Sequence, residues 1–136
     1  MTIIDIPFVK LTGIEQEDNT LSLEFKKDVL NHLQTFHAGA QFTLAESASG
    51  YCLQQLFPEL SSEVILVLRD ANIKYKKPAT RKLTAHASVS NEMIEKFMDG
   101  FKRKNRASIV VDVELVDPDN TISSRSSFTW FVQKIN

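Results

Sequence analysis

The spacing of hydrophobic residues along the first half of the chain predicts a strand followed by a long helix. Leu21, Leu23 and Phe25 alternate with polar residues, which is typical of a half-buried strand. From residue 38 to residue 57, hydrophobic and small residues recur at helical spacing, and Pro58 ends the run. Because this stretch carries almost no charge, we expect its helix to be buried nearly all round.

The second half of the chain contains four more strands and a second helix by the same criteria. Residues 91–104 combine one apolar stripe with acidic residues in the first turn and basic residues in the last, which favours an amphipathic helix. Asn91 is its expected N-cap, and Gly100 is a place where the helix can end or bend. The expected strands are residues 64–77, 83–89 and 107–115 and a last strand through residues 128–132.

One apolar helix among about five long strands indicates a curved, mostly antiparallel sheet wrapped around that helix, which is an α+β class. The 136 residues fit a single domain, residues 1–136. A sheet of this kind leaves edge strands to which a second copy can pair. We therefore expect a homodimer.

The composition is that of an ordinary globular protein. Hydrophobic residues make up 43% of the chain and charged residues 24%, so disorder and a coiled coil are poor interpretations. Cys52 is the only cysteine, and no group of Cys and His residues has the spacing of zinc ligands, so we expect neither a disulfide nor a metal. The chain begins without a signal-peptide pattern and has no apolar run long enough to span a membrane, which favours a cytoplasmic protein.

Charge is unevenly distributed along the chain, although its net value is −1. Residues 74–106 hold ten basic and three acidic side chains, whereas the segments on either side are acidic overall. Clustered positive charge attracts phosphate-bearing partners, but it also fits a solvated turn and the C-terminus of a helix. No aromatic-rich motif accompanies the basic residues, so nucleic acid is not the expected partner.

Glu46 is the only charged residue of the expected buried helix, and no basic residue lies three or four positions away. Burying an ionised carboxylate is costly, so either its pKa is raised or it has a hidden polar partner. A raised pKa suits general acid–base catalysis near neutral pH. The other interpretation is a Glu at the helix edge that reaches water or a strand backbone. The residues that share its helical face are Gly39, Phe42, Ser49, Gly50 and Leu53.

The segment from Asn31 to Ser47 resembles the signature of small hotdog-fold acyl-CoA thioesterases of the phenylacetyl-CoA and 4-hydroxybenzoyl-CoA kinds. In these enzymes an Asn is followed six residues later by His-Gly-Gly, and an Asp or Glu follows nine residues after the His. Asn31, His37 and Glu46 keep this spacing. The resemblance implies a hotdog fold, in which an antiparallel sheet of about five to six strands wraps around a long central helix.

The resemblance also implies hydrolysis of an acyl-CoA and a role for each residue of the motif. Glu46 would activate a water molecule as general base or attack the carbonyl itself. The N–H of Ala38, which stands at the first glycine of the motif, would stabilise the oxyanion, and Gly39 keeps the second glycine. Asn31 would orient the water or the carbonyl. The site would lie at the interface of a homodimer or of a dimer of dimers.

A coenzyme A substrate would explain the basic segments, because its phosphates are negatively charged. Arg81, Lys82, Arg103 and Arg106 are the candidates for binding its phosphates, with arginine best suited to two-pronged contacts. Coenzyme A belongs to the substrate here, so no separate cofactor is expected.

Two other functions stay open. Ala38 in place of glycine, and Gly50 where some family members have Thr or Ser, also fit a protein that binds acyl thioesters or serves as a dimeric scaffold without catalysis. A hotdog dehydratase or hydratase would pair a histidine with the helix acid, and none of His32, His37 and His86 clearly fills that role.

Overall fold

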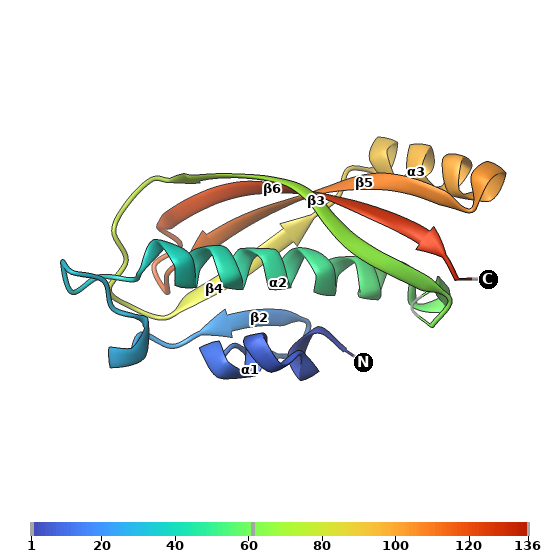
Figure 1. Cartoon of the computed structure of the whole chain (residues 1–136). Helices are drawn as coiled ribbons and strands as arrows, with labels where there is room; N and C mark the ends of the chain where they lie inside the picture. The colour runs from blue at the N-terminus through green and yellow to red at the C-terminus, as the bar shows by residue number, and fades with distance from the viewer. Residues whose placement is uncertain (1, 61, 136) are drawn as a thin grey trace.

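The computed structural model describes residues 2–60 and 62–135. Its six strands form one antiparallel sheet that curls around helix α2 (Ala38–Leu56), as Figure 1 shows. The order across the sheet is β1-β2-β4-β5-β6-β3. This arrangement confirms the predicted hotdog architecture. The strands are β1 (Glu15–Glu17), β2 (Thr20–Leu23), β3 (Val64–Tyr75), β4 (Leu83–Ser88), β5 (Arg106–Val116) and β6 (Ile122–Lys134).

Helix α2 starts after the capping residue His37 and ends before Pro58, as the sequence predicts. On the side that faces the sheet, residues such as Leu44 are completely buried. A second face, which carries Phe42 and Glu46, is only half-buried and forms the open side of the helix, although the ring of Phe42 packs against Phe128 of β6. The prediction of burial nearly all round holds for the middle of the helix, where every residue from 41 to 54 is buried or half-buried, and is wrong for its ends, where Ala38 and Leu56 are exposed.

The core lies between α2 and the inner face of the sheet. Ile109, Val111 and Val113 of β5 point inward and are at most 1% exposed. Trp130 of β6 donates a hydrogen bond from its indole Nε1 to Oγ of Ser49 on α2, over 2.8 Å. This bond satisfies a buried donor, which would otherwise cost about 1–3 kcal/mol, and it fixes the position of α2 on the sheet.

Strand β3 forms one edge of the sheet and ends at Tyr75, two residues earlier than predicted. Its inward-facing residues Val64 and Leu66 are half-buried and pack against the core. On the outer face, Ile65 is 51% exposed and Val67 43% exposed. An edge strand with exposed apolar residues is a surface on which another strand can pair. The homodimer itself stays a prediction.

Helix α3 (Asn91–Lys104) packs on β5 near the C-terminal end of α2. Its apolar stripe faces inward, and Phe97 is 2% exposed. The N-cap is Ser90 instead of the predicted Asn91, because the Ser90 hydroxyl accepts the N–H of the third helical residue. The helix continues through Gly100, so this glycine does not end it.

The N-terminal segment packs on α2, and its elements were not predicted. The Cδ1 atom of Ile3 would lie 3.0 Å from a Cβ on Gly50, so the missing side chain of Gly50 lets this segment approach the helix. Ile3 thus fills the space beside Gly50, the position where the resemblance would allow Thr or Ser.

The short helices of the structure are η1 (Ile3–Asp5), α1 (Pro7–Thr12), η2 (Lys27–Val29) and η3 (Pro58–Leu60).

Candidate active site

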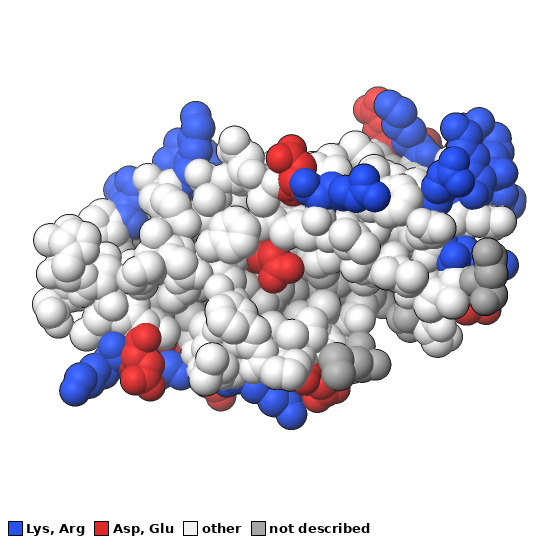
Figure 2. All heavy atoms as spheres, in the orientation of Figure 1, with Lys and Arg blue, Asp and Glu red and all other residues white. Residues whose placement is uncertain are grey.

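Glu46 lies midway along α2 and is half-buried, on the helical face that also carries Phe42 and Gly50. Within residues 2–60 and 62–135, its carboxylate forms no hydrogen bond or ion pair. Figure 2 shows a broad uncharged surface over α2 with a single acidic side chain in its middle. Burial raises the pKa of Glu46 above its ordinary value of 4.5. Glu46 thus combines features of both interpretations, because its pKa is raised while its half-buried side chain still reaches the surface.

The start of α2 presents backbone N–H groups close to solvent. His37 caps the helix, because its ring Nδ1 accepts the N–H of Gly39 over 2.8 Å. The N–H of Gly39 is therefore engaged within the chain. By contrast, the N–H of Ala38 meets no acceptor in the part of the chain that the structure describes, and this residue is exposed. Ala38 thus offers a free donor at the positive end of the helix.

Tyr75 is a residue of this region that the sequence analysis missed. Its hydroxyl donates a hydrogen bond of 2.9 Å to the carbonyl oxygen of Ala38. Partial burial raises the pKa of the Tyr75 phenol, which keeps it in the donor form. The end of edge strand β3 is thereby tied to the first turn of α2.

Asn31 holds the loop that leads into α2. Its Oδ1 accepts the N–H groups of Leu33 and Thr35 over 2.8 and 3.0 Å. Its Nδ2 donates to Oγ1 of Thr35 over 2.8 Å and to the carbonyl of Phe36 over 3.3 Å. These four bonds use the full capacity of the amide, so Asn31 is placed to position the loop. A direct contact with substrate stays a prediction.

Ala38 and Glu46 do not meet within one chain. They are eight residues apart on α2, which corresponds to about 12 Å along the helix axis at 1.5 Å per residue. A single thioester carbonyl is much smaller than this separation. One chain therefore does not bring the two groups to a single carbonyl.

Two of the predicted phosphate-binding residues, Arg81 and Lys82, lie just before β4. Both are engaged in ion pairs on the surface. Arg81 pairs with Asp119 at 2.7 Å. Lys82 contacts Glu17 and lies 3.6 Å from a carboxylate oxygen of Glu24.

The other two, Arg103 and Arg106, lie at the far end of the sheet. Arg103 pairs with Asp99 at 3.4 Å, whereas Arg106 meets no acidic group among the described residues. Because Thr84 of β4 is opposite Val116, ten residues along β5 from Arg106, the two basic pairs are roughly 30 Å apart. In Figure 2 the basic side chains form several separate groups, with the largest at the right-hand end of the molecule. One chain therefore does not bring all four residues to one phosphate group.

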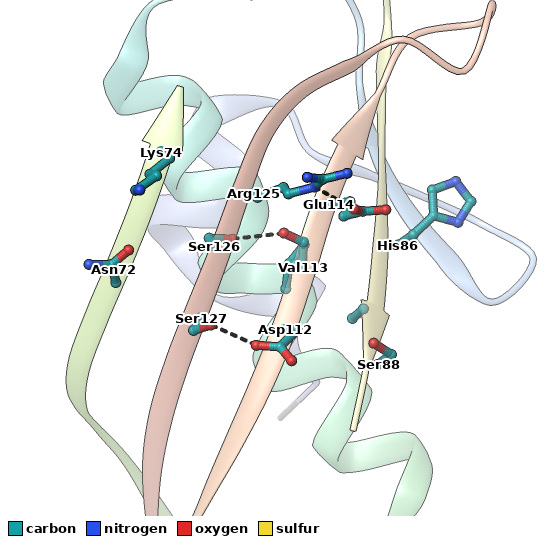
Figure 3. Close-up of a pocket in the computed structure, with 11 residues that line it drawn as sticks. Asn72, Lys74, His86, Ser88, Asp112, Val113, Glu114, Arg125, Ser126 and Ser127 are labelled. Atoms are coloured by element: carbon teal, nitrogen blue, oxygen red, sulfur yellow. Dashed lines mark hydrogen bonds and ion pairs between the residues drawn. The ribbon is translucent and has the colours of Figure 1, made fainter. Parts of the chain in front are cut away.

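A hollow of about 550 Å³ lies on the outer face of the sheet (Figure 3). Its polar groups largely satisfy one another: Ser127 donates to Oδ1 of Asp112 over 2.6 Å, and Arg125 pairs with Glu114 at 2.8 Å. The ring of His86 points away from both acidic residues in Figure 3. This pattern is typical of the solvated face of an antiparallel sheet, and it is remote from Glu46.

The remaining reactive side chains do not add to the site. His32 and His86 are exposed, and His37 is used as the helix cap. Burial raises the pKa of the Cys52 thiol, which makes it a poor nucleophile. No cluster of three or more metal-type ligands occurs among the described residues, and no described helix has the length and hydropathy needed to cross a membrane.

A family model described as DUF4442, a domain of unknown function, matches residues 8–132. The chain belongs to the DUF4442 family. A search of curated proteins gave no match to this DUF4442 domain. Similarity to proteins of other families is found at the level of the structure.

The solved structures that are similar to this DUF4442 domain include three proteins of 18–24% identity. A protein from Pseudomonas aeruginosa described as a probable thioesterase has a TM-score of 0.81 and 21% identity, covering 96% of this chain and 89% of that one. A thioesterase from Haemophilus influenzae has a TM-score of 0.75 and 18% identity, with 97% and 86% covered. A Bacillus halodurans protein solved with CoA has a TM-score of 0.72 and 24% identity, with 92% and 74% covered. The DUF4442 domain thus shares its hotdog fold with these proteins.

Proposed function

We propose that this DUF4442 domain hydrolyses an acyl-CoA, or a related acyl thioester, to the free acid and the thiol. The observation that carries the proposal is Glu46, a half-buried carboxylate of raised pKa without a basic partner, on the open side of the central helix. A carboxylate in such a setting can take a proton from water near neutral pH. Its fold is shared with proteins described as thioesterases and with one solved with CoA, which supports the substrate class.

In the reaction, Glu46 takes a proton from water while the water oxygen forms a bond to the thioester carbon. The carbonyl oxygen becomes an oxyanion, which the free N–H of Ala38 stabilises at the start of α2. The C–S bond then breaks, and the thiolate takes the proton back from Glu46. In the other route the carboxylate attacks the carbon itself, and water hydrolyses the resulting anhydride.

The separation of about 12 Å between Ala38 and Glu46 supports a site made by two copies of the chain. Glu46 of one copy would face the N–H of Ala38 in a second copy. The open side of α2 and the exposed residues of β3 are the surfaces that such a homodimer would cover. Two equivalent sites follow from a two-fold axis.

Binding of the coenzyme A phosphates would then draw on basic residues from different copies. Arg81 and Lys82 lie at one end of the sheet, and Arg103 and Arg106 at the other, so a phosphate group would meet one of the two pairs. Because three of these residues are already in surface ion pairs, binding would exchange one exposed partner for another.

A non-catalytic acyl-thioester-binding protein is the second candidate. It is favoured by one observation: His37 occupies the N–H of Gly39, so one of the donors at the start of α2 is already used within the chain. A dehydratase or hydratase has less support, because none of the three histidines lies on the open side of α2 beside Glu46.

The test is release of free thiol from a panel of acyl-CoA esters by the purified full chain. Loss of a general base typically costs a factor of about 10²–10⁴, so we expect Glu46→Gln and Glu46→Ala to lose most of the activity. Glu59→Gln, a change of an exposed acid just beyond α2, is the matched control and should leave the rate unchanged. Equal rates for wild type and both Glu46 variants would overturn the proposal. Tight binding of acyl-CoA without thiol release would favour the second candidate.

A further inference from the structure

His37 connects the loop before α2 to the first turn of this helix through three hydrogen bonds. Its backbone N–H donates to the carbonyl of Val29 over 2.7 Å, and its own carbonyl accepts the N–H of Gln41 over 3.1 Å. Its ring Nδ1 accepts the N–H of Gly39 over 2.8 Å. Because the peptide unit is planar and trans, the N–H of Ala38 points opposite to the His37 carbonyl, away from the helix. The orientation of His37 therefore sets the direction of this donor.

Gly39 leaves room for the ring of His37 to lie over the first turn. A Cβ atom at position 39 would lie 3.1 Å from Nδ1 of His37 and 3.3 Å from its Cε1, which is closer than an ordinary contact. The helix itself does not require a glycine here, because Gly39 has no left-handed backbone and glycine is a poor helix former. Gly100 of α3 differs, since a Cβ there would meet the Cβ of Ala107 at an ordinary 3.5 Å. The missing side chain at position 39 thus serves the capping ring.

The cap depends on the protonation state of the ring. A neutral imidazole has one acceptor nitrogen, so acceptance at Nδ1 places the proton on Nε2. A protonated imidazole has two donors and no acceptor, so it would lose the bond to Gly39. Its positive charge would also oppose the positive end of the helix dipole. Both effects of protonating His37 therefore weaken the first turn of α2.

The other titratable groups around this cap lie on three elements. The hollow of about 450 Å³ beside His37 is lined by the exposed Asp28 of η2, whereas helix α1 contributes uncharged side chains to it. Tyr75 of β3 bonds to the carbonyl of Ala38, and burial raises the pKa of its phenol, so it stays a donor near neutral pH. Glu46 is nine residues further along α2, which corresponds to about 13.5 Å of helix. Histidine is the residue type whose charge ordinarily changes near neutral pH, and His37 is the histidine beside this donor.

We infer that His37 is a positioning residue for the proposed hydrolysis: its neutral ring, seated over Gly39, holds the N–H of Ala38 toward the oxyanion, and protonation of the ring disables this donor. This inference rests on the proposed function. The donor acts on charge that develops in the transition state, so its loss lowers kcat and leaves KM almost unchanged. Removal of an oxyanion donor costs about 10²–10³ in kcat, and a donor that is retained but misdirected should cost less, about tenfold.

Four variants test the positioning role with the panel of acyl-CoA esters. We expect His37→Ala to lower kcat about tenfold and His37→Asn to keep it within about twofold of wild type, because an Asn side chain also accepts an N–H at a helix N-cap. Gly39→Ala should lower kcat as His37→Ala does, since its Cβ displaces the ring, whereas the matched Gly100→Ala should leave kcat unchanged. A His37→Asn variant as slow as His37→Ala would overturn the inference, and so would a Gly39→Ala variant as fast as Gly100→Ala.

The pH dependence separates the ring of His37 from Glu46. Protonation of Glu46 lowers the rate of wild type and of histidine variants alike, so it cancels in the ratio of variant kcat to wild-type kcat. For His37→Asn this ratio should rise about fivefold or more from about pH 8 to about pH 5.5, since only wild type loses its cap. For His32→Asn, a change of an exposed histidine in the preceding loop, the ratio should stay constant. A constant ratio for His37→Asn would contradict the inference.

NMR distinguishes a failure of this inference from a failure of the proposed function. If no thioester is hydrolysed, the proposed function fails, and the nitrogen chemical shifts of the His37 ring and of the Ala38 amide show whether the ring controls the donor. We expect the Nε2–H tautomer in the neutral ring, and an Ala38 amide signal that changes as the ring titrates in wild type but not in His37→Asn. The Nδ1–H tautomer, or an Ala38 signal that stays unchanged through the titration, would overturn the inference.

Discussion

Glu46 owes its altered acidity to burial alone, because no basic side chain among the described residues pairs with it. This residue could be found from the sequence, since a single charge in a long uncharged helix is a visible exception to the pattern. Tyr75 could not be found, because an aromatic residue at the end of a strand is an ordinary part of the pattern. Its bond to Ala38 depends on how β3 and α2 meet in space.

The raised pKa of Glu46 predicts a pH-dependent cost to stability. Between the ordinary value of 4.5 and the raised value, the folded chain binds more protons than the unfolded chain, so the free energy of unfolding falls as pH rises through this range. Glu46→Gln removes that cost. We expect its melting temperature to equal that of wild type at about pH 4 and to exceed it at about pH 7. Thermal unfolding at both pH values measures this, and a Gln variant that is less stable at neutral pH would contradict it.

At the scale of elements, the sequence predicts the long members of the fold and misses the short ones. Helices α2 and α3 and strand β5 appear within about two residues of their expected bounds. Helix α1 has six residues and β1 has three, which is too short for a helical or alternating pattern to stand out. The sequence also could not predict that one side of α2 is open. An uncharged helix face has the same sequence pattern whether its own sheet or a second copy of the chain covers it.

The loop before α2 depends on one amide. Asn31→Ala removes four hydrogen bonds at a partly buried position, and we expect a loss of about 1–3 kcal/mol in the free energy of unfolding. Asn31→Asp keeps the two acceptor contacts and loses the two donors, so its loss should be smaller. Urea denaturation with both variants measures the order. If Asn31→Ala were as stable as wild type, the loop would not rely on this side chain.

On the scale of the whole molecule, one chain does not bring the residues of the proposed site together. Residues Ala38 and Glu46 are about 12 Å apart along the axis of one helix, and the basic residues lie at both ends of the sheet. The number of residues between two motif positions does not by itself give their distance in space. The separation follows once residues 38–46 are known to be helical, because a helix rises about 1.5 Å per residue.

A mixing experiment can test whether two copies share the site. Ala38→Pro removes the N–H at the first helical position, where proline is tolerated, and His37 already has the extended backbone that precedes a proline. We expect Ala38→Pro and Glu46→Gln each to be inactive alone. When the two are co-expressed and pair at random, half of the dimers hold one intact site, so about a quarter of the wild-type activity should return. A mixture as inactive as its components would show that the site does not combine these two groups from different copies.

The hydrogen bond from Tyr75 to the carbonyl of Ala38 links edge strand β3 to the residue whose N–H would polarise the thioester. A second copy that pairs with β3 would stabilise this strand. Through the Tyr75 hydrogen bond, it would also stabilise the first turn of α2. After dissociation the unpaired strand would fray. The Ala38 N–H would then be less well oriented toward a thioester, although the core would stay folded. Turnover per polypeptide should accordingly drop on dilution at concentrations where circular dichroism still reports an intact fold.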